Sequence, residues 1–113
     1  MKIAIKLTTE GKASLIDLTA DRNELLTLQM AVGGLIEAKT LESGYTLFMN
    51  EEGKLHNLSI NERATEIWLA NFPNFPDVIV GDVVIAGGTD EEGEQLGLDA
   101  DYANQLLELF AKS

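Results

Sequence analysis

The chain of 113 residues contains no cysteine, one histidine and only two prolines. Without thiols it can form no disulfide, no thiolate nucleophile and no zinc–thiolate site. The single histidine, His56, has no serine in a G-x-S-x-G elbow to activate, so no catalytic triad can be assembled around it. We expect His56 to be structural or exposed. The sequence supports enzyme function least of all classes, and predicts no catalytic residue, metal ion or cofactor.

Basic residues are also scarce. Eight lysines and arginines face 19 acidic residues, which gives a formal net charge of −11. Binding to phosphate backbones or anionic lipids depends on lysine and arginine, so we expect no direct contact with nucleic acid or membranes. Two interpretations of the acidity remain open. The acidic residues either keep the protein soluble, or they meet a basic partner and imitate nucleic acid.

Long hydrophobic runs are missing as well. No segment approaches the roughly 20 apolar residues that cross a membrane, and the first 12 residues lack the apolar stretch of a signal peptide. We therefore expect a cytoplasmic protein. A chain of this length suits one domain and can bury roughly two-thirds of its unfolded surface, which predicts a single domain over residues 1–113.

Two strands and a helix are predicted at the start of the chain. Alternating apolar residues indicate a strand over 2–9, and a glycine turn returns the chain as a second strand over 13–19. A helix follows from Asp21, its expected N-cap, to the glycine pair that begins at Gly33. The expected buried stripe of this helix contains Leu25, Leu26, Leu28, Met30 and Val32.

Three strands and a second helix come next. Short turns separate the strands, which are predicted to form a meander over 35–40, 45–50 and 54–58. Ser59 and Asn61 are alternative N-caps for the second helix, in which Trp68 should anchor the core. The repeated N-F-P triplet at 71–76 predicts an extended loop, whose two phenylalanines we expect to cap the core.

The last third contains the most apolar run. Residues 78–85 lack alternation, which is typical of a strand covered on both faces, with a bend at Gly81. An acidic loop over 89–97 precedes a final helix capped by Asp99. Its expected buried stripe contains Tyr102, Leu106, Leu109 and Phe110. The predicted fold is α+β, with about six strands in a mostly antiparallel or mixed sheet and helices packed on it. The expected order is strand–strand–helix–strand–strand–strand–helix–strand–helix.

Four motifs occur in order along the chain: VGGLIEAKTL (32–41), NEEGKL (50–55), NERAT (61–65) and VIVGDVVIAG (78–87). Their combination resembles a family of small uncharacterised proteins from bacteria, phages and plasmids that share a domain of unknown function. The resemblance covers residues 28–97. It implies a cytosolic accessory protein, often carried on mobile elements, with no accepted catalytic residues.

The polar residues of these motifs define a candidate binding site between the 50–54 turn and the start of the second helix. Its members are Glu37, Asn50, Glu51, Lys54, Asn61 and Thr65. The acidic loop provides a second set of candidates for partner binding, namely Glu91, Glu92 and Glu94.

Two functions follow as hypotheses. The first is a small acidic, non-enzymatic interaction protein, encoded by a phage or mobile element, that binds and blocks a host defence or nucleic-acid-binding factor. The alternative is a protein that binds or sequesters a small ligand such as a nucleotide, using the polar residues near Asn50, Lys54 and Thr65. The net acidity disfavours an anionic ligand but is compatible with a local basic pocket of Lys39, Lys54 and Arg63. An exposed strand edge could also form a symmetric homodimer.

Overall fold

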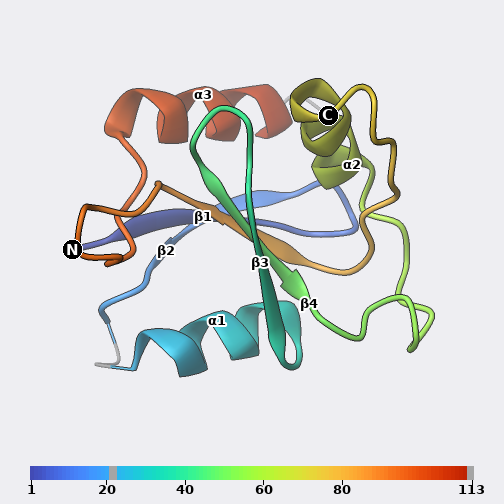
Figure 1. Ribbon diagram of the computed structural model, residues 1–113, viewed down its shortest axis with the longest axis horizontal. Helices are drawn as coiled ribbons and strands as arrows, with labels where there is room; N and C mark the ends of the chain where they lie inside the picture. The colour runs from blue at the N-terminus through green and yellow to red at the C-terminus, as the bar shows by residue number, and fades with distance from the viewer. Residues whose placement is uncertain (21–22, 112–113) are drawn as a thin grey trace.

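The computed structural model describes residues 1–20 and 23–111, in which one antiparallel sheet of five strands is combined with three helices (Figure 1). The strands are β1 (Ile3–Leu7), β2 (Ala13–Asp17), β3 (Ile36–Thr40), β4 (Thr46–Asn50) and β5 (Val83–Ala86). The helices are α1 (Glu24–Val32), α2 (Glu62–Asn71) and α3 (Ala100–Ala111). Every neighbouring pair in the order β2-β1-β5-β4-β3 is antiparallel, which confirms the predicted α+β class.

The sheet lies between two helical layers, with α1 on one face and α2 and α3 on the other (Figure 1). Strand β5 occupies the centre, and all four of its residues are buried. Because side chains alternate along a strand, Val83 and Ile85 face α2 and α3, whereas Val84 and Ala86 face α1. The prediction of a strand covered on both faces is confirmed.

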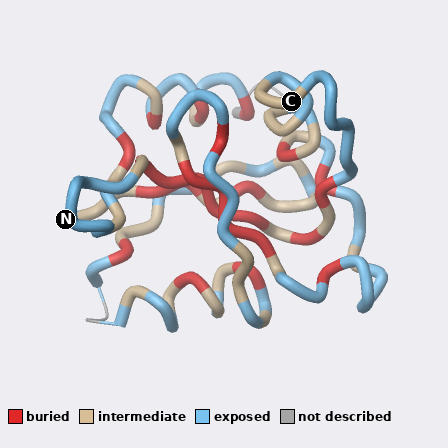
Figure 2. The backbone as a smooth tube through the Cα atoms, in the orientation of Figure 1, coloured by how far each residue is buried: buried red, intermediate tan, exposed pale blue. Residues whose placement is uncertain are grey.

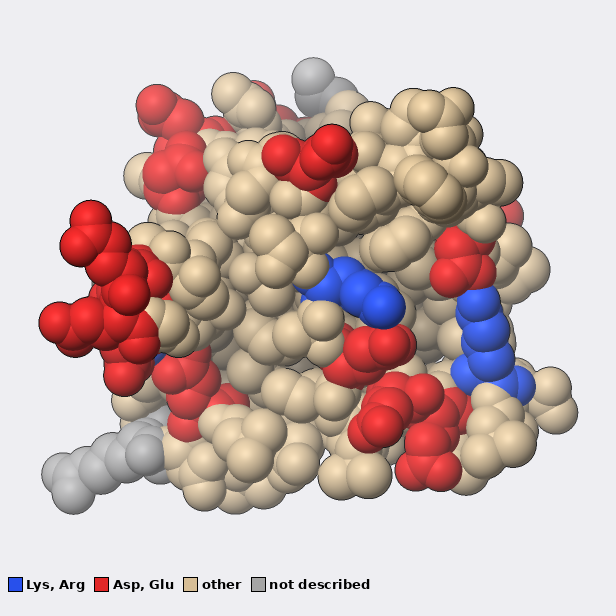
Figure 3. Space-filling model, viewed as in Figure 1, with Lys and Arg blue, Asp and Glu red and all other residues tan. Residues whose placement is uncertain are grey.

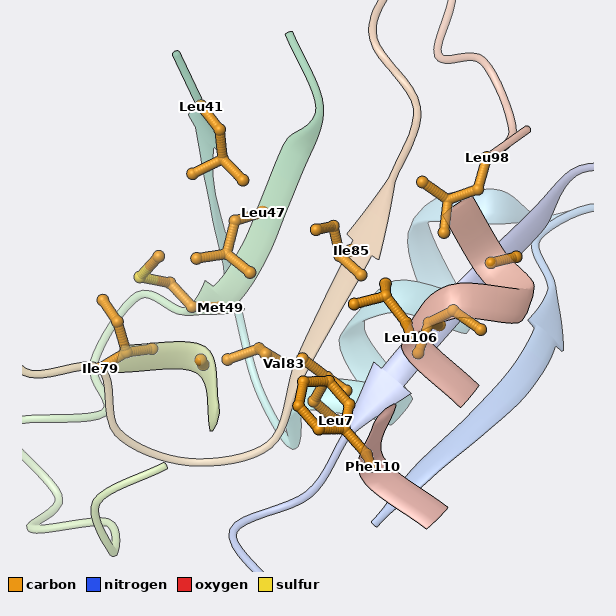
Figure 4. Close-up of a cluster of buried hydrophobic side chains, with 13 residues drawn as sticks. Leu7, Leu41, Leu47, Met49, Ile79, Val83, Ile85, Leu98, Leu106 and Phe110 are labelled. Carbon is orange, nitrogen blue, oxygen red and sulfur yellow. The ribbon is translucent and has the colours of Figure 1, made fainter. Parts of the chain in front are cut away.

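The core consists of two clusters separated by the sheet. The larger one joins the sheet to α2 and α3, and Figure 4 shows Leu7, Val83, Leu106 and Phe110 meeting there. The smaller one is centred on Phe48 and contains the buried residues of α1. Figure 2 shows that burial follows the sheet and the inner sides of the helices. Packing on both sides explains why an antiparallel sheet contains so few exposed positions in its central strands.

The predicted strand over 54–58 is wrong, because residues 51–57 form consecutive turns. The N–H of Leu58 donates to the carbonyl oxygen of Gly53 at 3.0 Å, which closes the chain on itself. The place beside β4 is taken by β5 instead. A wholly apolar strand gains more from the centre of a sheet than a segment containing lysine and histidine does, so the sheet has five strands and not six.

The strand predicted over 78–85 starts late, at Val83. Gly81 has a φ of +78°, which interrupts the extended backbone at the predicted bend. Before the bend, Val80 forms only an isolated bridge to Ile60.

The helix caps follow the sequence in part. The side chain of Asn23 accepts the N–H of Leu26 at 3.0 Å and caps α1, while Asp21, the predicted cap, lies outside the described residues. Of the two alternatives for α2, Asn61 is the cap. Asp99 caps α3 as predicted, by accepting the N–H of Tyr102 at 3.0 Å.

The predicted apolar stripes are wider than the buried ones. In α1, Leu28 and Val32 are buried, whereas Leu25, Leu26 and Met30 are largely exposed. A helix of nine residues contacts the sheet along one narrow face, so the flanks of the expected stripe remain in solvent. The final helix departs from its expected stripe in the same way, because Leu109 is exposed.

The N-F-P loop also divides its two aromatic residues. Phe72 is half-buried and its ring lies 4.6 Å from that of Trp68, whereas Phe75 is exposed. Capping of the core is therefore confirmed for Phe72 and wrong for Phe75. Trp68 packs against the core and donates its indole N–H to the carbonyl oxygen of Phe75 at 2.9 Å.

Replacing Leu28 with alanine tests the orientation of α1. We expect Leu28→Ala to lower the free energy of unfolding by about 2–5 kcal/mol, because it opens a cavity against the sheet. Met30→Ala on the same helix should change it by less than about 0.5 kcal/mol, because Met30 is 72% exposed. Urea denaturation followed by circular dichroism measures both, and equal losses in the two variants would contradict the described orientation.

Candidate functional site

Asn61 lies wholly buried at the start of α2 and connects three segments of the chain. Its amide nitrogen donates to the carbonyl oxygens of Leu7, at the end of β1, and Gly81, just before β5, at 3.0 and 2.9 Å. Its amide oxygen accepts the N–H of Ala64 at 3.0 Å, which caps the helix. The amide is thus occupied within the fold, where it holds α2 against the sheet.

Thr65 and Asn50 have similar connections. The Thr65 hydroxyl donates to the carbonyl oxygen of Asn61 at 2.8 Å and accepts the N–H of Ile79 at 3.0 Å. The Asn50 amide donates to the carbonyl oxygen of Val32, at the end of α1, at 3.3 Å. Both side chains therefore join segments that are distant in sequence.

Two glycines mark where these segments approach closely. A Cβ atom at Gly34 would lie 2.8 Å from the side-chain nitrogen of Asn50, and one at Gly53 would lie 2.9 Å from a methyl group of Val80. The VGG segment (32–34) thus packs on the NEEGK segment (50–54). The NEEGK segment packs in turn on the VIVGD segment (78–82), which is hydrogen-bonded to Asn61. The motifs that suggested a site form a single network of internal contacts.

A cleft of about 180 Å³ lies beside this network, between the β3 side of the sheet and α2. Its polar lining consists of Glu37, Lys39, Glu51, Lys54 and Asp77, together with Asn50. Its apolar lining includes Met49, Leu55, Trp68 and Val78. The cleft thus combines an apolar wall with charges of both signs.

Four of the five charged residues that line the cleft form two ion pairs. Lys54 forms an ion pair with Asp77, and Lys39 lies 3.4 Å from Glu37. The hydrogen bond from Lys54 lowers the pKa of Asp77 below its usual value, and the nearby charge of Lys39 adds to the effect. Figure 3 shows the same arrangement more widely, with blue basic side chains lying directly beside red acidic ones.

The structure brings part of the predicted site together. Glu37, Glu51 and Lys54 line the cleft. Asn50 also lines it, but its amide is turned towards the end of α1. Asn61 does not line the cleft and neither does Thr65; both serve the internal network described above.

Of the three residues of a possible basic pocket, Lys39 and Lys54 line the cleft, whereas Arg63 does not. Its guanidinium lies 5.3 Å above the ring of Phe110, and 3.5 Å separates it from the carboxylate of Glu66. Sequence reasoning also missed Asp77 as part of the cleft. Its partner Lys54 is 23 residues away, and no local pattern indicates the pairing.

The acidic loop over 89–97 is a tight turn. Thr89 and Gln95 form a bridge, and the carboxylate of Asp90 accepts the N–H groups of Glu92 and Glu94, each at 2.9 Å. The amide of Gln95 donates to the carbonyl oxygen of Gly87 at 2.6 Å, which ties the loop to the end of β5. The loop therefore presents the exposed side chains of Glu91, Glu92 and Glu94 on an internally bonded turn, and Figure 3 shows acidic atoms gathered there at the left.

The described residues provide neither a histidine-based site nor a cluster of metal-binding side chains. His56 is exposed and lies 4.0 Å from Glu52, in accord with the expectation for this residue. Within residues 1–20 and 23–111, no group of three or more acidic or histidine side chains is placed to hold a metal ion. None of the helices described is both long enough and apolar enough to span a membrane.

Replacing Asn61 tests the network. We expect Asn61→Ala to lower the free energy of unfolding by about 3 kcal/mol, because it removes a helix cap and leaves buried carbonyl groups without donors. Ser59→Ala, at the rejected cap position, should change it by less than about 0.5 kcal/mol. Thermal and urea denaturation provide the comparison. A Ser59 variant as unstable as the Asn61 variant would contradict this assignment of the cap.

Comparison with known proteins agrees with the motifs. No curated protein and no solved structure matches the chain. A match to the family described as Domain of unknown function (DUF3846) extends over residues 1–111, beyond the 28–97 segment that carries the motifs. The match confirms the resemblance seen in the sequence, and the chain belongs to the DUF3846 family.

Proposed function

We propose that the protein is a small non-enzymatic interaction protein that binds a basic surface of another protein through its acidic loop, residues 89–97. One observation carries the proposal. All six lysine and arginine side chains in the described part of the chain lie within 4.0 Å of a carboxylate. In the same part of the chain, Glu91, Glu92 and Glu94 have no basic side chain within that distance.

Pairing changes how the charge acts on a partner. Paired charges cancel at a distance, so the outward field comes from the carboxylates that no lysine or arginine neutralises. Other exposed carboxylates, such as Glu51 and Glu108, also have no lysine or arginine partner among the described residues, but Glu91, Glu92 and Glu94 are gathered within residues 91–94. The field is therefore concentrated at the loop, where it steers a basic partner and disfavours an acidic one. The internal hydrogen bonds of the turn reduce the entropy lost when the loop is immobilised in a complex. The solubility interpretation needs neither the turn nor its bonds.

The proposed partner is a nucleic-acid-binding protein of the host cell, whose basic surface the acidic loop covers. Surfaces that bind nucleic acid are rich in arginine and lysine, and carboxylates on a firm turn can replace phosphates there. The protein then blocks its partner by occupying that surface. A phage or mobile element that carries such a protein could disable a host defence factor in this way.

Reversing the charge of the loop tests the proposal. The triple variant Glu91→Lys, Glu92→Lys and Glu94→Lys should abolish capture of a basic protein from host lysate treated with nuclease. For the unchanged protein, capture should weaken between about 0.1 and 1 M salt, because the screening length falls from about 10 to about 3 Å. Affinity purification with quantitative mass spectrometry measures both effects.

A matched control separates the loop from total charge. Replacing Glu42, Asp101 and Glu108 with lysine changes the net charge equally at exposed positions outside the loop. This control should retain capture of the partner. If both triple variants lose it alike, or if the loop variant retains it, the acidic loop is not the contact.

The second candidate function is binding of a small ligand in the cleft. It is favoured by the convergence of Glu37, Glu51 and Lys54 on one cavity. A nucleotide has less support as the ligand, because sites for ligands of that size enclose about 300–1,000 Å³. The carboxylates of the cleft also outnumber its lysines, which disfavours a phosphate group.

A thermal-shift screen tests this second candidate. We expect no stabilisation by nucleotides at millimolar concentration, because the cleft is small and its charge repels anions. A ligand present at 100 times its dissociation constant would stabilise the fold by about 2.7 kcal/mol, which such a screen detects readily. A clear shift with one nucleotide, lost in a Lys54→Ala variant, would favour the ligand-binding function instead.

A further inference from the structure

We infer that the cleft between β3 and α2 is an anchoring pocket for one arginine side chain of the partner. The inference rests on the proposed function in that it requires a basic partner, and it adds a second contact with a defined chemistry. It concerns the cleft, whereas the proposed function concerns the acidic loop.

The size of the cleft limits what can enter it. Its volume of about 180 Å³ is below that of most pockets for cofactors and drug-sized ligands. It is sufficient for one long side chain. Interfaces commonly concentrate their binding energy in such a pocket, filled by a single anchor residue, and arginine is among the commonest anchors.

The charge of the cleft favours a cation. Three carboxylates line it, against two lysines, and Glu51 has no basic side chain within 4.0 Å in the described part of the chain. The two existing ion pairs do not block entry. Exposed pairs of this kind contribute little, so a guanidinium group can share or take over a carboxylate from Lys39 or Lys54 at low cost.

The apolar wall distinguishes arginine from lysine. Trp68, Leu55 and Val78 line the same cleft, and both Leu55 and Val78 are exposed although they are apolar. The methylene stem of a long basic side chain can pack on such residues while its charged end meets the carboxylates. A planar guanidinium also stacks on an indole ring and pairs with a carboxylate through two hydrogen bonds, which an ammonium cannot do.

The chain contains a built-in reporter of the cleft. Trp68 is the only tryptophan, so its indole N–H gives one resonance in a nitrogen–proton correlation spectrum. We would titrate the ¹⁵N-labelled full-length protein with N-acetyl-arginine amide. A saturable shift of that resonance is expected, with a dissociation constant on the order of millimolar. The citrulline analogue, which has the same shape and no charge, should give no saturable shift.

Two variants localise the binding. Glu51→Gln removes the carboxylate that has no basic neighbour and should weaken binding about 2- to 5-fold. Glu108→Gln makes the same change on α3, outside the cleft, and should leave binding unchanged. Both positions are exposed, so both variants should fold, and their spectra show this directly.

The outcomes are distinct from those of the loop experiment. The inference is overturned if arginine amide gives no saturable shift, if citrulline amide binds equally well, or if the two variants weaken binding alike. Any of these results leaves capture of a partner by the acidic loop unaffected. Conversely, if charge reversal of the loop has no effect on capture, the loop is not the contact, and the arginine titration still tests the cleft independently.

Discussion

The fold depends on the burial of one amide side chain, Asn61. An unbonded amide in this position would carry a cost of desolvation comparable to a sizeable part of a small protein's net stability. The native arrangement avoids that cost only if β1, the segment before β5 and the first turn of α2 meet at one place. Asn61 thereby fixes where these three elements lie relative to one another. The neighbouring contacts of Thr65, Asn50 and Gly53 extend the constraint to the rest of the motifs.

Local signals in the sequence predicted most elements, because alternation, capping residues and glycine turns act within a few positions. Both hairpins, all three helices and the buried run near Val83 were found in this way. The errors arose where distant segments compete. Residues 54–58 do not pair with β4, because β5, which follows some 25 residues later, takes that position. The exposed flanks of α1 depend on which face of the helix meets the sheet, and no local pattern describes that contact.

The candidate site was predictable to a similar extent and for the same reason. Glu37, Asn50, Lys54 and Thr65 were recognised because the fold did not obviously need them, yet Thr65 proved to be an internal connector. Asn61 was expected as a helix cap, and its bonds to β1 and to the segment before β5 were not foreseen. The pairing of Lys54 with Asp77 joins the turn after β4 to the segment between α2 and β5, so neither residue alone indicates it. A sequence gives the number of charges, whereas the distribution of neutralised and free charges is a property of the fold.

The central position of β5 has a consequence for synthesis of the chain. The two outer hairpins, β1–β2 and β3–β4, are complete once residue 50 has been made, but no strand pairs with both of them until residues 83–86 follow. During that interval the edges of β1 and β4 are open to other chains. A nascent chain therefore carries two half-sheets whose inner edges stay unpaired until the strand that unites them emerges. A chain that ended before residue 83 would keep both edges unpaired.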